Sequence, residues 1–529
     1  LTPQKYIMYR LCNLDPRWSN CKPWMFACVA YLELMQINRN INLVGTRGKK
    51  TIGAEGQMSY QLEDEYRALE GMANTPKYWK NFKYEVLSKL DNLGPFQFFF
   101  TLSCAEKRWN QNFARILSDQ GCKVRYEVIK EDSCKTKIEV KKNADDKWKP
   151  IEEFLKDDVD ESLHELIRQN VVSSTRYYDM RVKALLRHIV LHPSNPMKVK
   201  YYQYKVEFQN RGALHIHGCL WSDIKKIEKS DNGKDMKGLK SAFTKLRTGD
   251  DLLRQEREAL KNFVDRFITV STHKDKVGED LAVVACEIQQ HKCTACCRKY
   301  SEICRFGYPK LPSLETIITK PCKETGSKRQ KKIEKHNTTL DKVRSIIGDE
   351  EAVKEIMENY DKQSETLGDD YETNRKRRIQ DVLDLAEVSM DDYIAALNFS
   401  KQGCTIVLER DLDEIHVNPF NIEMLRAHDG NMDIQVCLDF FPIITYITDY
   451  LCKSDDELCN SIKAIMKNTD DKSVKERMRT LSNAFITHRS MGEAEAVVKI
   501  LPSLNLANSN VTCQWVSIDN QSDRSSRWK

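Results

Sequence analysis

The sequence predicts an α+β protein in which a small number of buried strands are embedded among long helical segments. Three observations carry this prediction. YYQYKVEFQNRGALHIHGCLW, at residues 201–221, has the period-two alternation of a β-hairpin around a short Asn-Arg-Gly loop. QFFFTLS, at residues 97–103, follows a Gly-Pro break and has the aromatic content of a buried strand. Residues 1–90 and 225–275 carry the spacing of amphipathic helices.

Composition limits the function classes. The 529 residues are 40% apolar and 31% charged, and no run of about 18 apolar residues exists, so no transmembrane helix is expected. The net charge of +6 permits nucleic-acid binding without requiring it. The chain starts at Leu1 without a signal-peptide pattern, which predicts an excised fragment whose 18 cysteines are mostly reduced.

Changes in composition and in hydrophobic pattern along the chain divide it into five segments. An N-terminal helical domain is expected first, then a core in two parts that flank a helical insertion, and last a helical segment with a disordered tail. The insertion is highly charged and includes a Cys/His cluster at residues 284–310. The predicted boundaries are 1–90, 91–225, 226–395, 396–460 and 461–529.

The hairpin predicts a metal site. His215 and His217 are two residues apart on one strand, so their imidazoles project from the same face. If Arg211 is the centre of the loop, Glu207 lies directly opposite His215 and diagonal to His217 on that face. A slip of one residue would move Glu207 to the other face. We expect His215, His217 and Glu207 to bind Mg²⁺ or Mn²⁺, with Gln209 as the reserve ligand.

A second chemical element is DFFPIITYITDYLCKS at residues 439–454, whose apolar spacing predicts a helix. Tyr446 and Tyr450 are four residues apart, so both hydroxyls emerge from one face, and Lys453 lies one turn beyond. Such a pair is most often half-buried packing. Beside a metal that polarises a phosphate, however, a tyrosine can act as a covalent nucleophile.

CEIQQHKCTACCRKYSEIC, at residues 286–304, contains five closely spaced candidate zinc ligands, and Cys293 and Cys296 have zinc-knuckle spacing. Four ligands chosen from the five would close a structural zinc site, although free thiols in a reducing compartment remain the alternative. The spacing does not decide between two adjacent cysteines. The candidates are His291, Cys293, Cys296, Cys297 and Cys304.

A phosphate-binding loop is not predicted. Gly45 and Gly48 precede Lys49, Lys50 and Thr51, but that loop needs four residues between its glycines. The basic runs KRQKK and RKRR, at residues 328–332 and 375–378, are typical of solvated linkers and are able to add sequence-independent phosphate contacts.

Several blocks together resemble the Rep nuclease region of Helitron or Helentron-like transposases, which are eukaryotic rolling-circle enzymes of the HUH endonuclease superfamily. The blocks are FFFTLSCAEKRW, VEFQNRGALHIHGCLW, HKCTACC…CRFGYPK, VNPFN, NMDIQ and YITDYLCK, and they cover most of residues 75–500. The resemblance implies an HUH-type core, which is a central antiparallel sheet flanked by helices, with large helical insertions and a small zinc-binding element. It places residues 98–103 beside a central His-x-His strand.

The resemblance also implies a function. Tyr446 and Tyr450 would be paired nucleophiles that cleave and rejoin single-stranded DNA at a transposon end, leaving a 5′-phosphotyrosine and a free 3′-OH, with Lys453 near the phosphate. A helicase domain is expected C-terminal to this region, and a nuclear location is implied. The family often has a basic residue before the second tyrosine, where this chain has Asp449, so Tyr446 is favoured as the first nucleophile.

Arg211, Arg108 and Trp109 are expected to contact the DNA strand. Two alternatives stay open: a catalytically silent relative that binds DNA without cutting it, and an initiator of viral or plasmid rolling-circle replication. The presence of every candidate group argues against the first, and the cysteine cluster with the VNPFN and NMDIQ blocks argues against the second.

Overall fold

A computed structural model gives the fold of the protein. The structure describes the following residues: 2–13, 15–48, 72, 76–128, 136–208, 213–230, 236–295, 297–298, 304–367, 371–438, 473–487, 491–504 and 506–514.

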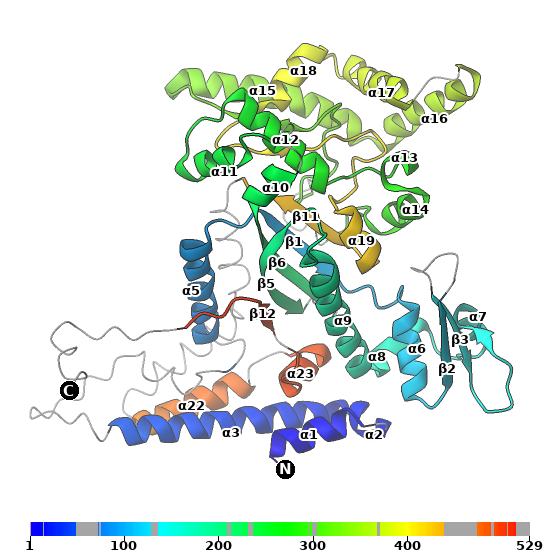
Figure 1. The fold of residues 1–529 in the computed structure, drawn as a ribbon, viewed down its shortest axis with the longest axis vertical. Coiled ribbons are helices and arrows are strands. Elements are labelled where there is room, and N and C mark those ends of the chain that lie inside the picture. Colours follow the sequence, from blue (N-terminus) through cyan, green and yellow to red (C-terminus); the bar gives the residue numbers. More distant parts are fainter. Residues whose placement is uncertain are drawn as a thin grey trace, which may run out of the picture.

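A five-stranded sheet lies at the centre of the molecule, with strand order β11-β1-β6-β5-β12 and every neighbouring pair antiparallel (Figure 1). The His-x-His strand β6 is the middle strand. β1 pairs with β6 through Phe100 and Gly218, among others, so the expected neighbour relation is confirmed. The bounds are β1 Phe98–Ser103, β5 Val199–Phe208, β6 Leu214–Ser222, β11 Met432–Val436 and β12 Ala507–Ser509.

The two faces of this sheet differ because side chains alternate along each strand. Phe98, Phe100 and Leu102 of β1 point to one face and are fully buried in the main hydrophobic core. The ring of Phe98 contacts the rings of Phe263 and Phe267, which belong to a helix that covers this face. The opposite face carries the two histidines. The apolar face therefore holds the sheet in place, and the other face is available for chemistry.

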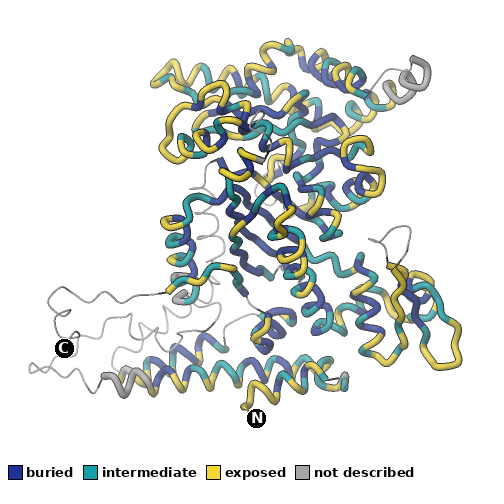
Figure 2. Tube along the Cα trace, in the orientation of Figure 1, coloured by how far each residue is buried: buried dark blue, intermediate teal, exposed yellow. Residues whose placement is uncertain are grey.

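Helices cover the apolar face and extend the same core (Figures 1 and 2). Tyr178 donates a hydrogen bond of 2.7 Å to the carbonyl of Leu102, which fastens one helix to β1. The bounds of these helices are α9 Val171–Leu185, the π-helical turn η2 Leu186–Val190, α10 Ile224–Ser230, α11 Leu239–Thr248, α12 Arg254–Phe267, α13 Lys274–Val277, α14 Glu279–Ile288 and α19 Ile422–His428.

On the histidine face, helix α5 (Pro76–Leu93) packs against the end of the sheet distant from the hairpin loop. Phe82, Val86 and Leu90 contact a small cluster that includes Phe99 and Trp221. This helix lies within the predicted helical region. Residues 49–71 of the region predicted to be helical lie outside the described residues.

The N-terminal helices lie beside the C-terminal ones (Figure 1). Lys499 bonds Glu33 at 3.0 Å across this contact, and both side chains are largely buried. A helical segment followed by a disordered tail was expected at residues 461–529, so the second helix of this region, α23, and strand β12 fall where a disordered tail was expected. The bounds are α1 Pro3–Leu11, α2 Pro16–Ser19, α3 Lys22–Gly48, α22 Val474–Thr487 and α23 Glu493–Ile500.

A small α+β unit with its own core follows β1 along the chain. Its two longer strands, β2 and β3, form an antiparallel pair. Phe113, Val140 and Phe154 are among its buried side chains. The bounds are α6 Asn110–Asp119, β2 Lys123–Val128, β3 Thr136–Lys141, β4 Lys149–Pro150, α7 Ile151–Asp157 and α8 Leu163–Gln169.

The charged insertion forms a helical layer with a separate core at the other end of the molecule (Figure 1). The RKRR run is a correction to the sequence analysis: Arg375 and Arg378 are buried and paired with Glu409 and Asp411, so they are not linker charges. The bounds are β7 Ile317–Ile318, β8 Lys320–Pro321, α15 Gly326–Ile347, α16 Glu350–Leu367, α17 Tyr371–Leu385, α18 Met390–Leu397, β9 Phe399–Ser400 and β10 Ile406–Val407.

No helix in the described part of the chain is both long and apolar enough to cross a bilayer.

Candidate functional site

The pairing of β5 with β6 sets the geometry of the histidine face. Glu207 pairs with His215 and Lys205 with His217, so the predicted register is confirmed. All four side chains therefore point to the same side of the sheet. The hairpin loop, with the predicted ligand Gln209 and the predicted DNA contact Arg211, lies outside the described residues.

The three predicted ligands are close together. The carboxylate of Glu207 lies 2.8 Å from Nε2 of His217, and the rings of His215 and His217 have centroids 4.6 Å apart. Nδ1 of His215 lies 3.0 Å from the hydroxyl of Ser103 on β1. This contact leaves Nε2 of His215 as its ligand atom and fixes the orientation of the ring, which is the usual task of a second-layer partner at a metal site.

The electrostatics favour ligand-ready protonation states. Burial, together with the neighbouring His217, lowers the pKa of His215 to about 4, so this imidazole is neutral at pH 7. Burial alone would raise the pKa of Glu207, but the hydrogen bond with His217 and the nearby positive charges outweigh burial, and the pKa is lowered. A neutral imidazole and an ionised carboxylate are the forms that bind a divalent cation.

This donor set combines two imidazole nitrogens with a carboxylate, which are ligand types that bind divalent metal ions. Among the described residues, the group of three or more His, Cys, Asp or Glu side chains that comes together as a candidate metal site is the cysteine cluster, which is described below.

Gly218, next to His217, allows the strands to approach. A Cβ at this position would overlap the ring of Phe100 and lie 3.0 Å from Cβ of Tyr204. The buried aromatic face therefore requires a glycine here, although its φ is not in the left-handed region.

Asp433 is a further acid on the same face that the sequence analysis did not single out. It pairs with Thr101, and Thr101 pairs with His217, so the three residues form one row across β11, β1 and β6. Burial raises the pKa of Asp433 to about 6. Its position in the NMDIQ block, one acid between two buried apolar residues, is the signal that could have identified it.

Tyr446, Tyr450 and Lys453 all lie outside the described residues, as does the rest of the predicted helix at 439–454. Their predicted role stays a prediction.

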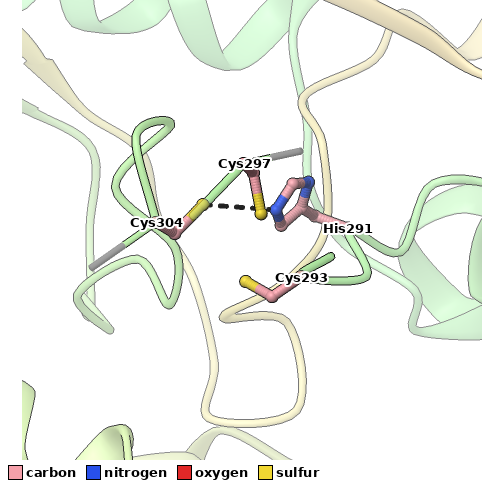
Figure 3. Close-up of side chains that lie close together, drawn as sticks. All are labelled: His291, Cys293, Cys297 and Cys304. Carbon is pink, nitrogen blue, oxygen red and sulfur yellow. Dashed lines mark hydrogen bonds between the residues drawn. The ribbon is translucent and has the colours of Figure 1, made fainter. Parts of the chain in front are cut away.

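The cysteine cluster is a compact candidate metal centre (Figure 3). His291, Cys293, Cys297 and Cys304 have ligand atoms all within 4.8 Å of one another, and Sγ of Cys304 lies 3.3 Å from Nε2 of His291. One imidazole and three thiols match the ligands of a closed zinc site. This set uses Cys297; the alternative Cys296 lies outside the described residues. The cluster could hold a metal such as zinc.

The cluster is held against the rest of the fold by aromatic contacts. The ring of Tyr308 stacks on His291 with centroids 4.3 Å apart, and its hydroxyl donates a 2.6 Å hydrogen bond to Asn418. Burial and the neighbouring thiols raise the pKa of Cys293 to about 11. A metal would remove this cost by binding the thiolate.

Arg108 and Trp109, which were predicted to contact DNA, make their contacts within the protein. Trp109 is 1% exposed, and its indole N–H donates a 2.8 Å hydrogen bond to the carbonyl of Asp429. Arg108 forms ion pairs with Glu287 and Asp429 at 2.5 and 2.6 Å. The burial of Trp109 is inconsistent with a direct contact to DNA, and Arg108 serves the packing of this region.

In a comparison with known families, residues 141–220 match the family described as Helitron helicase-like domain at N-terminus. The matched segment extends from β3 into β6 and so includes Glu207, His215 and His217. Searches of curated proteins and of solved structures found no significant match.

Proposed function

We propose that this Helitron-related protein is the nuclease of a rolling-circle transposase, an enzyme that cleaves and rejoins single-stranded DNA through a 5′-phosphotyrosine. The observation that carries the proposal is the set of His215, His217 and Glu207 on one face of the central antiparallel sheet. The relation to Helitron proteins itself implies nucleic-acid binding. In this proposal the sheet is the core of an HUH-type nuclease.

In the proposed site, His215, His217 and Glu207 hold Mg²⁺ or Mn²⁺, with Gln209 in reserve. When bound, such an ion polarises the scissile phosphate and stabilises charge on its non-bridging oxygens. Ser103 keeps the ring of His215 oriented through the 3.0 Å contact to Nδ1. The depressed pKa of His215 keeps this ring neutral at physiological pH.

The nucleophile in this proposal is the hydroxyl of Tyr446 or Tyr450. The hydroxyl gives up its proton as its oxygen attacks the phosphorus, the bond from phosphorus to the 3′ oxygen breaks, and the 3′ oxygen takes up a proton and leaves as a hydroxyl. The 5′ end remains on the tyrosine as a phosphodiester, so the bond energy is kept for rejoining. Asp449 favours Tyr446 as the first nucleophile, and Lys453 adds positive charge near the phosphate.

Further parts of the proposal concern the surroundings of the nuclease. The cysteine cluster would hold a structural Zn²⁺ ion, which is consistent with its one imidazole and three thiols. The proposal also includes a helicase domain C-terminal to this region and a nuclear location. Both follow from the proposed transposase role.

The test is the formation of a covalent adduct. The protein is incubated with Mn²⁺ and labelled single-stranded oligonucleotides that carry candidate transposon ends, and complexes that survive SDS are detected. We expect an adduct that is lost in the double variant Tyr446→Phe/Tyr450→Phe and in His215→Ala. The matched controls Tyr126→Phe and His188→Ala, at exposed positions, should retain it.

An adduct that persists without both tyrosine hydroxyls would disprove the mechanism. No adduct with any strand or metal, from a folded protein that still binds DNA, would instead favour a catalytically silent DNA-binding relative.

A further inference from the structure

A cavity of about 400 Å³ opens at the end of the β5–β6 pair that is distant from the hairpin loop. Its walls come from four parts of the chain that are far apart in sequence: the connection from α5 to β1, the start of β5, the end of β6 with the first turn of α10, and helix α11. The volume is in the range of pockets that bind a small organic ligand or one nucleotide unit.

One face of α11 is turned toward this cavity. Lys240, Phe243, Thr244 and Arg247 all line it, and their spacing of three, four and seven residues from Lys240 puts them on a single helical face. Leu239 and Ala242 are fully buried in the main core. The helix is therefore anchored by one side, which lets it present two cations and an aromatic ring on the other.

The cavity is strongly cationic. Lys225, Lys240 and Arg247 are exposed and have no carboxylate partner among the residues that the structure describes. Lys200 also lines the cavity, but it forms a 2.7 Å ion pair with Asp223, the only acid in the lining. Three cations are thus left for an anionic ligand, an arrangement suited to phosphate groups.

Aromatic side chains complete the lining. The half-buried ring of Phe243 is held edge-on by Phe263, with centroids 5.6 Å apart. Trp221 is fixed by a 2.8 Å hydrogen bond from its indole N–H to the carbonyl of Gly94. Phe243 is thus a rigid apolar surface beside the cations, and a planar base can stack on such a surface.

One wall of the cavity, Trp221, belongs to the histidine face of the sheet. Trp221 lies on the same strand as His217 and on the same side of it, four residues further on, which corresponds to about 13 Å along β6. Helix α5 packs over Phe99 and Trp221 on this face, so a DNA strand that joins the proposed metal site to the cavity would pass around that helix.

We propose that this cavity binds a nucleotide unit of the single-stranded DNA that flanks the scissile phosphate. Lys225, Lys240 and Arg247 contact its phosphates, and Phe243 stacks on its base. The inference rests on the proposed nuclease function, because it is the metal site that assigns the strand to this face of the sheet.

The test compares DNA affinity in two charge-matched variants of the full chain. Lys240→Glu/Arg247→Glu removes two cations from the cavity, and Lys237→Glu/Arg254→Glu makes the same change at exposed positions outside it. Fluorescence anisotropy with a labelled oligothymidylate of 20 nucleotides is measured from low to moderate salt, and circular dichroism checks the fold.

We expect the cavity variant to bind at least about tenfold more weakly than the control. We also expect its plot of log affinity against log salt to be shallower by about 1.4, since each lost contact to a single strand is worth about 0.7. Phe243→Leu should weaken binding by about fivefold or more with an unchanged salt slope, because stacking is lost and charge is kept. Equal affinities of the two charge variants would overturn the proposal.

Two further measurements separate this inference from related ideas. Thymidine monophosphate, tested as a competitor, distinguishes a site for free nucleotides from one for a strand; competition as strong as that of the oligonucleotide at equal nucleotide concentration would overturn the strand assignment. The SDS-stable adduct reports on the nuclease alone. If the wild-type protein forms no adduct, and DNA affinity falls only in the cavity variant, the result would support the cavity as a DNA site and disprove the nuclease function.

Discussion

The carboxylate of Glu207 lies 2.8 Å from Nε2 of His217, although the residue directly opposite Glu207 in the β5–β6 register is His215. Glu207 thus contacts one histidine on the diagonal while its backbone is aligned with the other. Diagonal neighbours in an antiparallel pair are within reach of long side chains. The carboxylate therefore contacts His217 and lies opposite His215, and the arrangement of all three groups depends on a single strand register.

The first prediction follows from this arrangement. Glu207→Gln keeps the size of the side chain and its acceptor oxygen but removes the charge that a divalent ion requires. We expect the rate of Mn²⁺-dependent cleavage to fall by at least about a hundredfold, while affinity for single-stranded DNA measured without metal changes little. Glu228→Gln, outside the site, is the matched control. Cleavage at the wild-type rate in Glu207→Gln would remove this residue from the site.

The second prediction concerns pH. His428 is fully buried, donates a 2.9 Å hydrogen bond from Nε2 to the carbonyl of Ser103, and has its pKa lowered to about 3 by burial. Below a pH of about 6.5 the unfolded chain takes up this proton and the folded protein does not, so stability falls as pH falls. The loss approaches about 1.4 kcal/mol per pH unit until the pH nears 3.

His428→Gln keeps a side-chain N–H and cannot titrate in this range. Its unfolding free energy, measured by chemical denaturation between pH 7 and 4.5, should therefore depend less on pH than that of the wild type, whatever its value at pH 7. His188→Gln, at an exposed position, should leave the wild-type slope unchanged. Parallel curves for the wild type and His428→Gln would contradict the assignment.

A third prediction addresses the cysteine cluster. Purified protein should contain one tightly bound zinc ion per chain by mass spectrometry under native conditions. Cys297→Ser should lose the ion and at least about 3 kcal/mol of stability at working zinc concentrations. Cys286→Ser, an exposed cysteine close by in sequence, should keep both. If Cys297→Ser retained the zinc and Cys296→Ser lost it, the fourth ligand would be the other cysteine of the pair.

The fourth prediction tests the close approach of β6 to β1. Gly218→Ala should cost about 1–3 kcal/mol, because the added methyl group would overlap the ring of Phe100. Thermal unfolding measures the loss. Gly492→Ala, where no atom lies within 4 Å of the new methyl group, is the matched control. Phe100→Leu should recover part of the stability in the Gly218→Ala background but not in the wild type.

The local parts of this fold were predictable from sequence. Alternation and a glycine-containing loop define the register of Glu207 with His215, because a one-residue slip would bury the polar face. The aromatic strand at Phe98–Ser103 and most of the helices follow from periodicity alone. Four of the five candidate zinc ligands come together in the structure, although spacing could not choose between Cys296 and Cys297.

The parts that could not be predicted depend on distant partners. Ala507–Ser509 has no strand pattern of its own and becomes β12 through pairing with β5. Arg375 belongs to a basic run, and nothing near it in sequence indicates that Glu409 neutralises it inside the helical layer. Asp433 joins the histidine face because Thr101 lies between it and His217, a relation that only the sheet order creates.

The order of strands in the central sheet has a consequence for how the protein folds. Only β5 and β6 are joined by a short loop; Phe98 pairs with both Leu220 and Val436, and Ala507 pairs with Lys205. A sheet of such high contact order closes slowly, since long stretches of chain must be ordered before its pairs form. The hairpin that carries Glu207, His215 and His217 can therefore assemble early, whereas the edge of β5 stays open until the chain is complete through Ser509. A chain truncated before that point would expose a bare strand edge, which makes it prone to aggregate.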